Sequence, residues 1–284
     1  MSLTRIVKLC VVIATCTAAG CGADQLPGPH RITWRFQLGD IVTYRIKMSF
    51  PGSGEGSNTA EVVEELEVLK VFENGDFWIG SKLREVNLKW RNGVWRSGGH
   101  KDSTENAPSV LMDIAQGLNG YNAIVVTEWG FVRGGKIYKS REEAVGNPKG
   151  GRGLGSDGLG VLPLDRLRLP RKEIRTGESW EEPPEPITVD ADGPKISFGG
   201  KLMRIDSDTA ELQCRMAVTK LSNSQDKKWD SIPARKVSAQ VVWRNDVGVM
   251  SRCKLEESEV YPSSSFVKQL DVELHSMVRN GKPR

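Results

Sequence analysis

An alternation of apolar and polar side chains with a period of two dominates this sequence after about residue 33. Residues 41–50 show it most clearly, because every second side chain is apolar and those between are mostly polar. The same period recurs in 78–90, 237–243 and 266–278. Successive side chains of a strand point to opposite faces, so this period predicts antiparallel strands with one face on a core.

The last of these segments has a predicted buried face and a predicted polar face. Phe266, Leu270, Val272, Leu274 and Val278 are expected on the buried side. The opposite side is expected to carry Asp271, Glu273 and Arg279.

Glycine-containing dipeptides between the strand-like runs predict tight hairpin turns. These are Asn74-Gly75, Asn92-Gly93 and Gly134-Gly135. Asn-Gly and Gly-Gly supply the positive φ angles that tight hairpin turns require. Around Asn92-Gly93, the side chains of Trp90 and Trp95 are expected to be cross-strand neighbours.

The chain contains a faint internal repeat. Gly39-Asp40, which opens one strand-like run, aligns with Gly177-Glu178, and residues 68–83 resemble 202–218. We predict a mainly β fold of two related antiparallel units, arranged as a meander, a half-barrel or a sandwich. The first unit covers 34–140 and the second 177–284, with a Gly/Pro-rich linker at 141–176. One short helix is expected near 107–117, where apolar residues keep helical spacing.

The first 21 residues predict the compartment. Arg5 and Lys8 precede an apolar run at 9–19, which is too short to cross a bilayer. Ala18-Ala19-Gly20-Cys21 follows and resembles the bacterial lipobox, although Ala18 stands where leucine is commonest. The resemblance implies a signal peptide at 1–20, a lipid on Cys21 and a tether at 21–33 that holds the protein to a membrane of the cell envelope. The alternative is an ordinary signal peptide and a secreted soluble protein.

Charge and cysteine content agree with export. The formal net charge is +4, and about +2 without Arg5 and Lys8, with basic clusters no longer than pairs such as Lys227-Lys228. We therefore expect no nucleic-acid partner. Apart from the leader and Cys21, the cysteines are Cys214 and Cys253. Both have apolar neighbours at strand spacing, so we expect either a disulfide or two buried thiols.

Motifs for catalysis, metals and cofactors are weak. Residues 130–136 approach a phosphate-binding loop, but Ile137 stands where Ser or Thr is required. Residues 153–158 match G-x-G-x-x-G inside a glycine-rich run, where chance matches are expected. His30, His100 and His275 lack acidic or cysteine partners at ligand spacing. The sequence predicts no catalytic residue, no metal site and no cofactor. Glu61, Glu64, Glu65 and Glu67 are expected on a solvated strand face.

The eight tryptophans raise the prospect of a stacking site. Trp90 and Trp95 are the best candidates for an exposed pair that contacts a ligand. Core or rim packing is the alternative for both, and Trp180 and Trp243 are expected in the core.

The openings at Gly39 and Gly177, the helix followed by a hairpin at Thr127–Gly130, and the Leu-Pro-rich stretch before Gly177 together resemble a group of two-repeat, β-rich bacterial envelope proteins. That resemblance implies an architecture and brings no activity with it. The first hypothesis is a non-enzymatic, lipid-anchored protein that binds or scaffolds an unidentified envelope protein. The second is a carrier of lipid or another apolar ligand inside a curved sheet. The third is an enzyme acting on polysaccharide or peptide.

Overall fold

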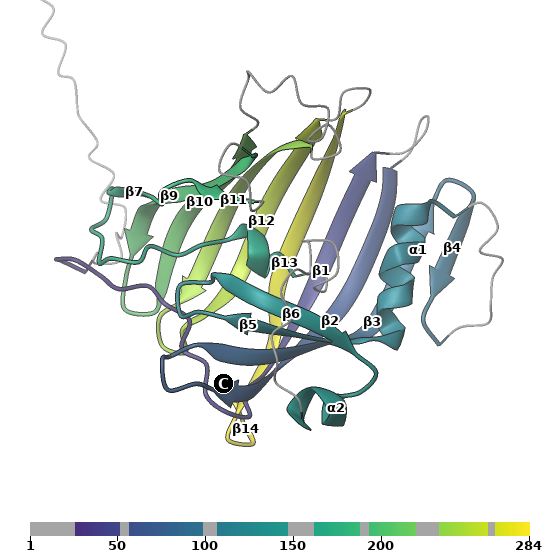
Figure 1. The fold of residues 1–284 in the computed structure, drawn as a ribbon, viewed down its shortest axis with the longest axis horizontal. Coiled ribbons are helices and arrows are strands. Elements are labelled where there is room, and N and C mark those ends of the chain that lie inside the picture. The colour runs from purple at the N-terminus through teal and green to yellow at the C-terminus, as the bar shows by residue number, and fades with distance from the viewer. Residues whose placement is uncertain are drawn as a thin grey trace, which may run out of the picture.

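The structure is a computed structural model that describes residues 26–51, 57–98, 107–146, 162–187, 193–219, 233–260 and 265–284. Within them, 14 strands form one antiparallel sheet, which is not closed into a barrel (Figure 1). The predicted mainly β fold is confirmed. The strands are β1 (Ile41–Pro51), β2 (Ser57–Val71), β3 (Phe77–Trp90), β4 (Gly93–Arg96), β5 (Tyr121–Val126), β6 (Val132–Tyr138), β7 (Ser179–Glu181), β8 (Glu185–Pro186), β9 (Lys195–Ile205), β10 (Thr209–Thr219), β11 (Ala234–Arg244), β12 (Val249–Val260), β13 (Ser265–Arg279) and β14 (Lys282–Pro283).

The two halves of the chain share this sheet. Its order is β6-β5-β3-β2-β1-β13-β12-β11-β10-β9-β7, so β1 and β13 pair at the junction. In both halves, three strands follow one another along the sheet in reverse chain order. These are β3-β2-β1 in the first half and β10-β9-β7 in the second half. We call the face that carries Val42, Tyr44 and Ile46 the inner face, because these side chains lie in the core. The opposite side is the outer face.

The two repeat openings make the same backbone hydrogen bonds. Gly39 N–H donates to the Val68 carbonyl at 2.9 Å, and Val68 N–H donates to the Asp40 carbonyl at 2.9 Å. The matching bonds run from Gly177 to Leu202 at 2.7 Å and from Leu202 to Glu178 at 3.0 Å. Gly39 and Gly177 have φ of +78° and +84°, a conformation that glycine adopts without strain. The sequence repeat therefore corresponds to a repeated local structure.

The predicted turns have mixed outcomes. Gly75 has φ +83° in the loop between β2 and β3, which confirms the first turn. Gly134-Gly135 lies within β6 instead, so that prediction is wrong. The hairpin turn lies earlier, where Gly130 has φ +88° and donates its N–H to the Thr127 carbonyl. The sequence rule failed because glycine also occurs inside this edge strand.

The face assignment of β13 is correct as far as Leu274 and wrong after it. The register against β1 shifts between Thr43 and Tyr44, which inserts one extra residue into β13. Met277 and Arg279 are consequently buried, while Val278 is only half-buried. The alternation of apolar and polar residues in the sequence does not reveal this shift, because the bulge depends on pairing with a distant strand.

Helices and irregular segments cover parts of the sheet. The predicted helix is present as α1 (Ser109–Gln116), which packs against β2 and β3 through the buried Leu111. A second helix, α2 (Arg141–Gly146), follows β6. The segment 30–36, part of it in the predicted tether, packs against the core through Ile32, Trp34 and Phe36. Within the described part of the chain, no helix has both the length and the apolar character needed to cross a membrane.

Candidate binding surfaces

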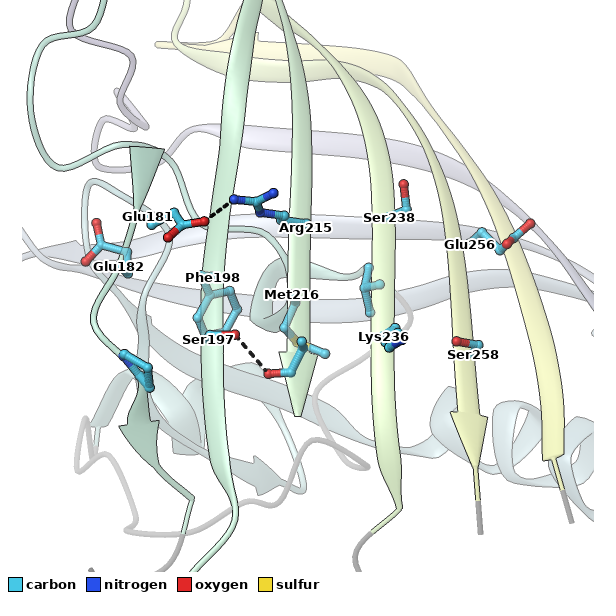
Figure 2. A pocket seen from close by; sticks show the side chains of 13 residues that line it. Glu181, Glu182, Ser197, Phe198, Arg215, Met216, Lys236, Ser238, Glu256 and Ser258 are labelled. Carbon is cyan, nitrogen blue, oxygen red and sulfur yellow. Dashed lines mark hydrogen bonds and ion pairs between the residues drawn. The ribbon is translucent and has the colours of Figure 1, made fainter. Parts of the chain in front are cut away.

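The outer face of β9–β13 is hollowed toward the ends of these strands. One part has a volume of about 670 Å³ and an adjoining part about 590 Å³. The two parts share Ser238 and Glu256. We call the combined depression the outer hollow, and Figure 2 shows the first part of it.

Small side chains on four adjacent strands, Ser197, Ala217, Ser238 and Ser258, form the floor of the outer hollow. Ser197, Ala217 and Ser258 belong to one row in register, in which Lys236 holds the position on β11. Neighbouring positions on one face of a sheet lie about 5 Å apart across strands. Serine and alanine in adjacent strands leave space that long side chains would fill. The depression therefore follows directly from the sequence at these positions.

Charged groups of both signs border this floor. Arg215 on β10 forms an ion pair with Glu181 on β7, and Figure 2 shows both side chains at the rim. Ser238 pairs with Arg215 in the next row, and Glu256 pairs with Ser238. Lys47, Lys254 and Asp271 border the second part. These groups would favour a polar partner that carries hydrogen-bonding and charged groups.

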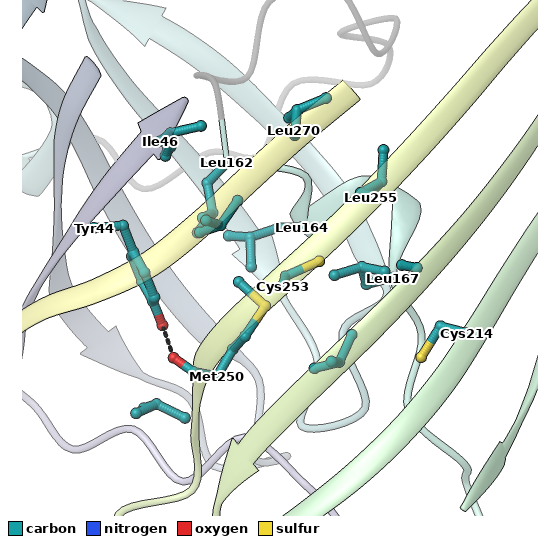
Figure 3. Packing of buried hydrophobic residues seen from close by; sticks show 14 of the residues in the cluster. Tyr44, Ile46, Leu162, Leu164, Leu167, Cys214, Met250, Cys253, Leu255 and Leu270 are labelled. Carbon is teal, nitrogen blue, oxygen red and sulfur yellow. Dashed lines mark hydrogen bonds between the residues drawn. The ribbon is translucent and has the colours of Figure 1, made fainter. Parts of the chain in front are cut away.

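The inner face is covered by a chain segment that the sequence assigned to the linker. We call residues 162–169 the strap. Leu162, Leu164, Leu167 and Leu169 are buried in the same apolar cluster as the inner-face residues. In Figure 3, Leu162 and Leu164 lie beside Leu270 and Cys253. The strap thus fills space over β1, β12 and β13 that an apolar ligand would otherwise occupy.

Buried carboxylates hold the strap in place. Glu64, which is 1% exposed, accepts hydrogen bonds from the Leu162 N–H at 2.7 Å and from the Ser81 hydroxyl. Glu257, also 1% exposed, accepts from Arg166 Nε at 3.2 Å. These contacts connect the start and the middle of the strap to the sheet.

Further arginines complete this network. Arg235 contacts Glu257 at 3.3 Å and Glu259 at 2.7 Å. Arg168, at the other end of the strap, binds both carboxylate oxygens of Glu185 at 2.9 and 3.0 Å. Buried charges are tolerated in proteins when they are paired and hydrogen-bonded in this way.

Sequence reasoning missed these carboxylates. Glu64 was expected on a solvated face with Glu61, yet it has the same parity along β2 as the buried Val62 and Leu66. Glu257 similarly has the parity of the buried Cys253 and Leu255. The sequence did contain a signal for these buried carboxylates, which is an acidic residue at a position where the alternation of the strand places apolar residues.

Cys214 and Cys253 are free, buried thiols. Cys214 pairs with Ala239, whereas Cys253 pairs with Val241, so β11 lies between the two cysteines. Their Cα atoms are therefore about 10 Å apart or more, beyond the roughly 7 Å that a disulfide can span. This separation contradicts a disulfide between Cys214 and Cys253, and the structure instead contains two separate buried thiols. Burial raises the pKa of the Cys214 thiol to about 12 and also raises the pKa of Cys253, so neither is a ready nucleophile.

Trp90 and Trp95 do not form an exposed pair. Trp90 is 6% exposed and belongs to the core, and Trp95 is partly buried against the same core. The register pairs Trp90 with Gly93 and Trp95 with Leu88, so they are not direct cross-strand neighbours. A Cβ on Gly93 would lie 2.4 Å from the Trp90 ring. Glycine at position 93 therefore makes room for the Trp90 ring. The turn itself consists of Arg91 and Asn92, the two residues between β3 and β4.

The remaining predicted sites are separate from these surfaces. Cys21 and His100 lie outside the described residues. His30 Nε2 donates a hydrogen bond to the Leu26 carbonyl at 3.1 Å, and His275 is exposed on β13. Across the seven described segments, no group of three or more His, Cys, Asp or Glu side chains has the geometry of a metal site.

A third depression of about 340 Å³ lies on the outer face beside α2. Its charged side chains include two ion pairs, Arg84 with Glu65 and Arg141 with Glu67. Tyr121 also lines it, and burial raises the pKa of this phenol. Much of its charge is thus already neutralised within the protein.

Comparisons with known proteins identify no family. No protein-family model and no curated protein sequence matches the chain. Among solved structures, the chain is similar to one described as "Lipid-protein interactions in lipovitellin", with a TM-score of 0.45 and 11% identity. The match covers 86% of this chain and 26% of that chain, so this chain spans about a quarter of the length of that protein.

Proposed function

We propose that the protein is an exported, lipid-anchored, non-catalytic binding protein of the cell envelope, and that the outer hollow is its binding surface. The outer hollow supports this proposal because small side chains from four adjacent strands line it, namely Ser197, Ala217, Ser238 and Ser258. Solvated sheet faces commonly carry long polar side chains, which would fill such a depression. The leader and Cys21 support the export and the anchor.

The binding role is tested by filling the hollow. Ser238→Trp places a large ring on its floor, and Ser276→Trp makes the same change at an exposed position of β13. Each variant and the wild type, as the mature protein, are used to isolate partners from envelope extracts. We expect one partner to be retained by wild type and by Ser276→Trp and lost with Ser238→Trp. Equal retention by both variants would contradict the assignment, as would turnover of any substrate in a broad hydrolase screen.

The anchor is tested by metabolic labelling with a fatty-acid probe. Wild type is expected to incorporate the label, and Cys21→Ala is expected to incorporate none. Equal labelling of the two proteins would show that the lipid is not on Cys21.

The alternative function is a carrier of lipid or another apolar ligand on the inner face. The strap is the observation behind this alternative, because among the described residues a single short segment, rather than a second sheet, covers the apolar inner face over β1, β12 and β13. A ligand on that face would have to displace Leu162 and Leu164. Native mass spectrometry after gentle extraction distinguishes the two functions, because a carrier emerges with ligand bound and the proposed binding protein emerges without lipid in its core.

A further inference from the structure

The described chain begins against one end of the sheet. Leu26 donates its N–H to the carbonyl of Ile205, the last residue of β9, at 3.3 Å. A few residues later, His30 and Ile174 form a two-way backbone bridge with bonds of 2.8 and 3.0 Å. The chain is therefore fixed to the body of the protein from residue 26 onward.

Antiparallel pairing defines which other segments share that end. The register places Ile41 opposite Val278, and Thr209 opposite Arg244. The start of β1 thus lies at the same end as the β9–β10, β11–β12 and β13–β14 turns, which is the lower end in Figure 1. We call this the turn end.

Only four residues separate Cys21 from Leu26. Five residue steps of extended chain reach at most about 18 Å. From this limit we infer that the turn end faces the lipid bilayer, and this inference rests on the proposed acylation of Cys21. A body held this close to its anchor cannot turn its opposite end to the same membrane without breaking the contacts of Leu26 and His30.

Exposed apolar side chains at the turn end fit a lipid surface. Leu38 is 64% exposed just before Gly39, and Leu26 is 41% exposed. Met203, near the end of β9, is 47% exposed. Charged residues at the same end of the sheet include Asp206 in the β9–β10 turn and Asp246 in the β11–β12 turn. Apolar side chains interspersed with charged ones suit the boundary between headgroups and acyl chains.

The orientation places the outer hollow away from the bilayer. From Ala210 to Ala217 along β10 there are seven residue steps, which correspond to about 23 Å of strand. Ala217 lies on the floor of the hollow. A partner would then approach the sheet at a distance from the membrane, without competition from the lipid surface.

The test uses the full-length acylated protein in vesicles of phosphatidylethanolamine and phosphatidylglycerol. An environment-sensitive fluorophore is attached at Leu38→Cys or at Val267→Cys, which are exposed positions at the turn end and the opposite end. Quenching by nitroxide lipids is then measured. We expect strong quenching at position 38 and at least threefold weaker quenching at position 267.

Two failures are distinguishable in this experiment. If Cys21→Ala leaves acylation and vesicle binding unchanged, the anchor assignment fails and the inference fails with it. If acylation on Cys21 is present and quenching is equal at the two positions or stronger at 267, the orientation alone is overturned.

Discussion

At the residue scale, one buried ion pair joins the first and last long strands. Asp40 is fully buried and receives hydrogen bonds from Arg279 Nε at 3.0 Å and Nη2 at 2.7 Å. Arg279 Nη2 also donates to the Arg35 carbonyl at 2.8 Å. The pair sits where β1 meets β13, so it connects the two halves of the sheet.

Removing the arginine is therefore expected to be costly. Arg279→Met would leave the buried Asp40 charge without its cationic partner, at a cost of about 3–5 kcal/mol in the free energy of unfolding. Arg252→Met removes an exposed ion pair with Glu273 and is expected to cost less than about 1 kcal/mol. Urea denaturation of both variants measures the difference. Similar losses in the two would contradict the role given to Arg279.

The cysteines give a second prediction at this scale. Both thiols are buried, so we expect negligible reaction of Cys214 and Cys253 with a thiol reagent in the native protein. A mature Cys21→Ala protein, unfolded without reductant, should release two reactive thiols per chain. A count of zero would show that a disulfide had formed.

The burial of a single side chain could be predicted only where it follows from the alternation of side chains along one strand. Burial of Cys214 and Cys253 followed from their apolar neighbours, whereas their separation by β11 depends on the order of strands. Arg279 was assigned to the wrong face because the bulge opposite Tyr44 depends on the register with β1.

At the element scale, close packing between strands constrains particular glycines. A Cβ on Gly200 of β9 would lie 2.4 Å from the Gln213 carbonyl oxygen and 2.4 Å from the Trp180 ring. The backbone oxygen belongs to the paired strand β10 and has little freedom to move. Glycine is thus required where β7, β9 and β10 come together.

Gly200→Ala is expected to destabilise the protein by about 1–3 kcal/mol, because the added methyl overpacks this contact. Gly146→Ala serves as the control, since a Cβ at that position meets no atom within 4 Å. Thermal unfolding should show a lower Tm for Gly200→Ala and a nearly unchanged Tm for Gly146→Ala. Equal melting temperatures would show that β9 has space at position 200.

The β9–β10 turn predicts a pH dependence. The Asp206 carboxylate accepts the Thr209 N–H at 2.7 Å and the Asp208 N–H at 3.0 Å, and these bonds lower the pKa of Asp206. A lowered folded-state pKa stabilises the fold above the unfolded value of about 3.9, and the gain is lost as pH falls through the folded pKa. Asp206→Asn should therefore reduce the loss of stability on acidification below about pH 4.

Urea denaturation of wild type and Asp206→Asn at pH 7 and pH 3 measures this effect. Asp208→Asn changes a neighbouring residue of the same turn and controls for the loss of one negative charge. If wild type and Asp206→Asn lose equal stability between the two pH values, the turn does not contribute as described.

Elements were predicted well when their pattern was local. The strands at 41–50 and 237–243 and the helix near 107–117 follow from periodicity and are present as β1, β11 and α1. The strap was not predicted, since its leucines look like a linker until the inner face of the sheet is assembled opposite them.

At the scale of the whole molecule, the two repeat units combine into one sheet with two different faces. The inner face is filled by the strap and by 30–36, while the outer face contains a hollow floored by small side chains. The repeat was visible in the sequence. The hollow was not, because its floor consists of serines and alanine brought together from four separate strands.

The most direct test of the binding assignment is site-specific photocrosslinking in intact cells that export the full chain. A photoreactive side chain replaces Ser238 in the outer hollow, and Ser276 on the same face provides the control position. We expect a discrete crosslinked partner from position 238 and none from position 276. The same partner captured equally from both positions, or only from 276, would contradict the assignment of the outer hollow as the binding surface.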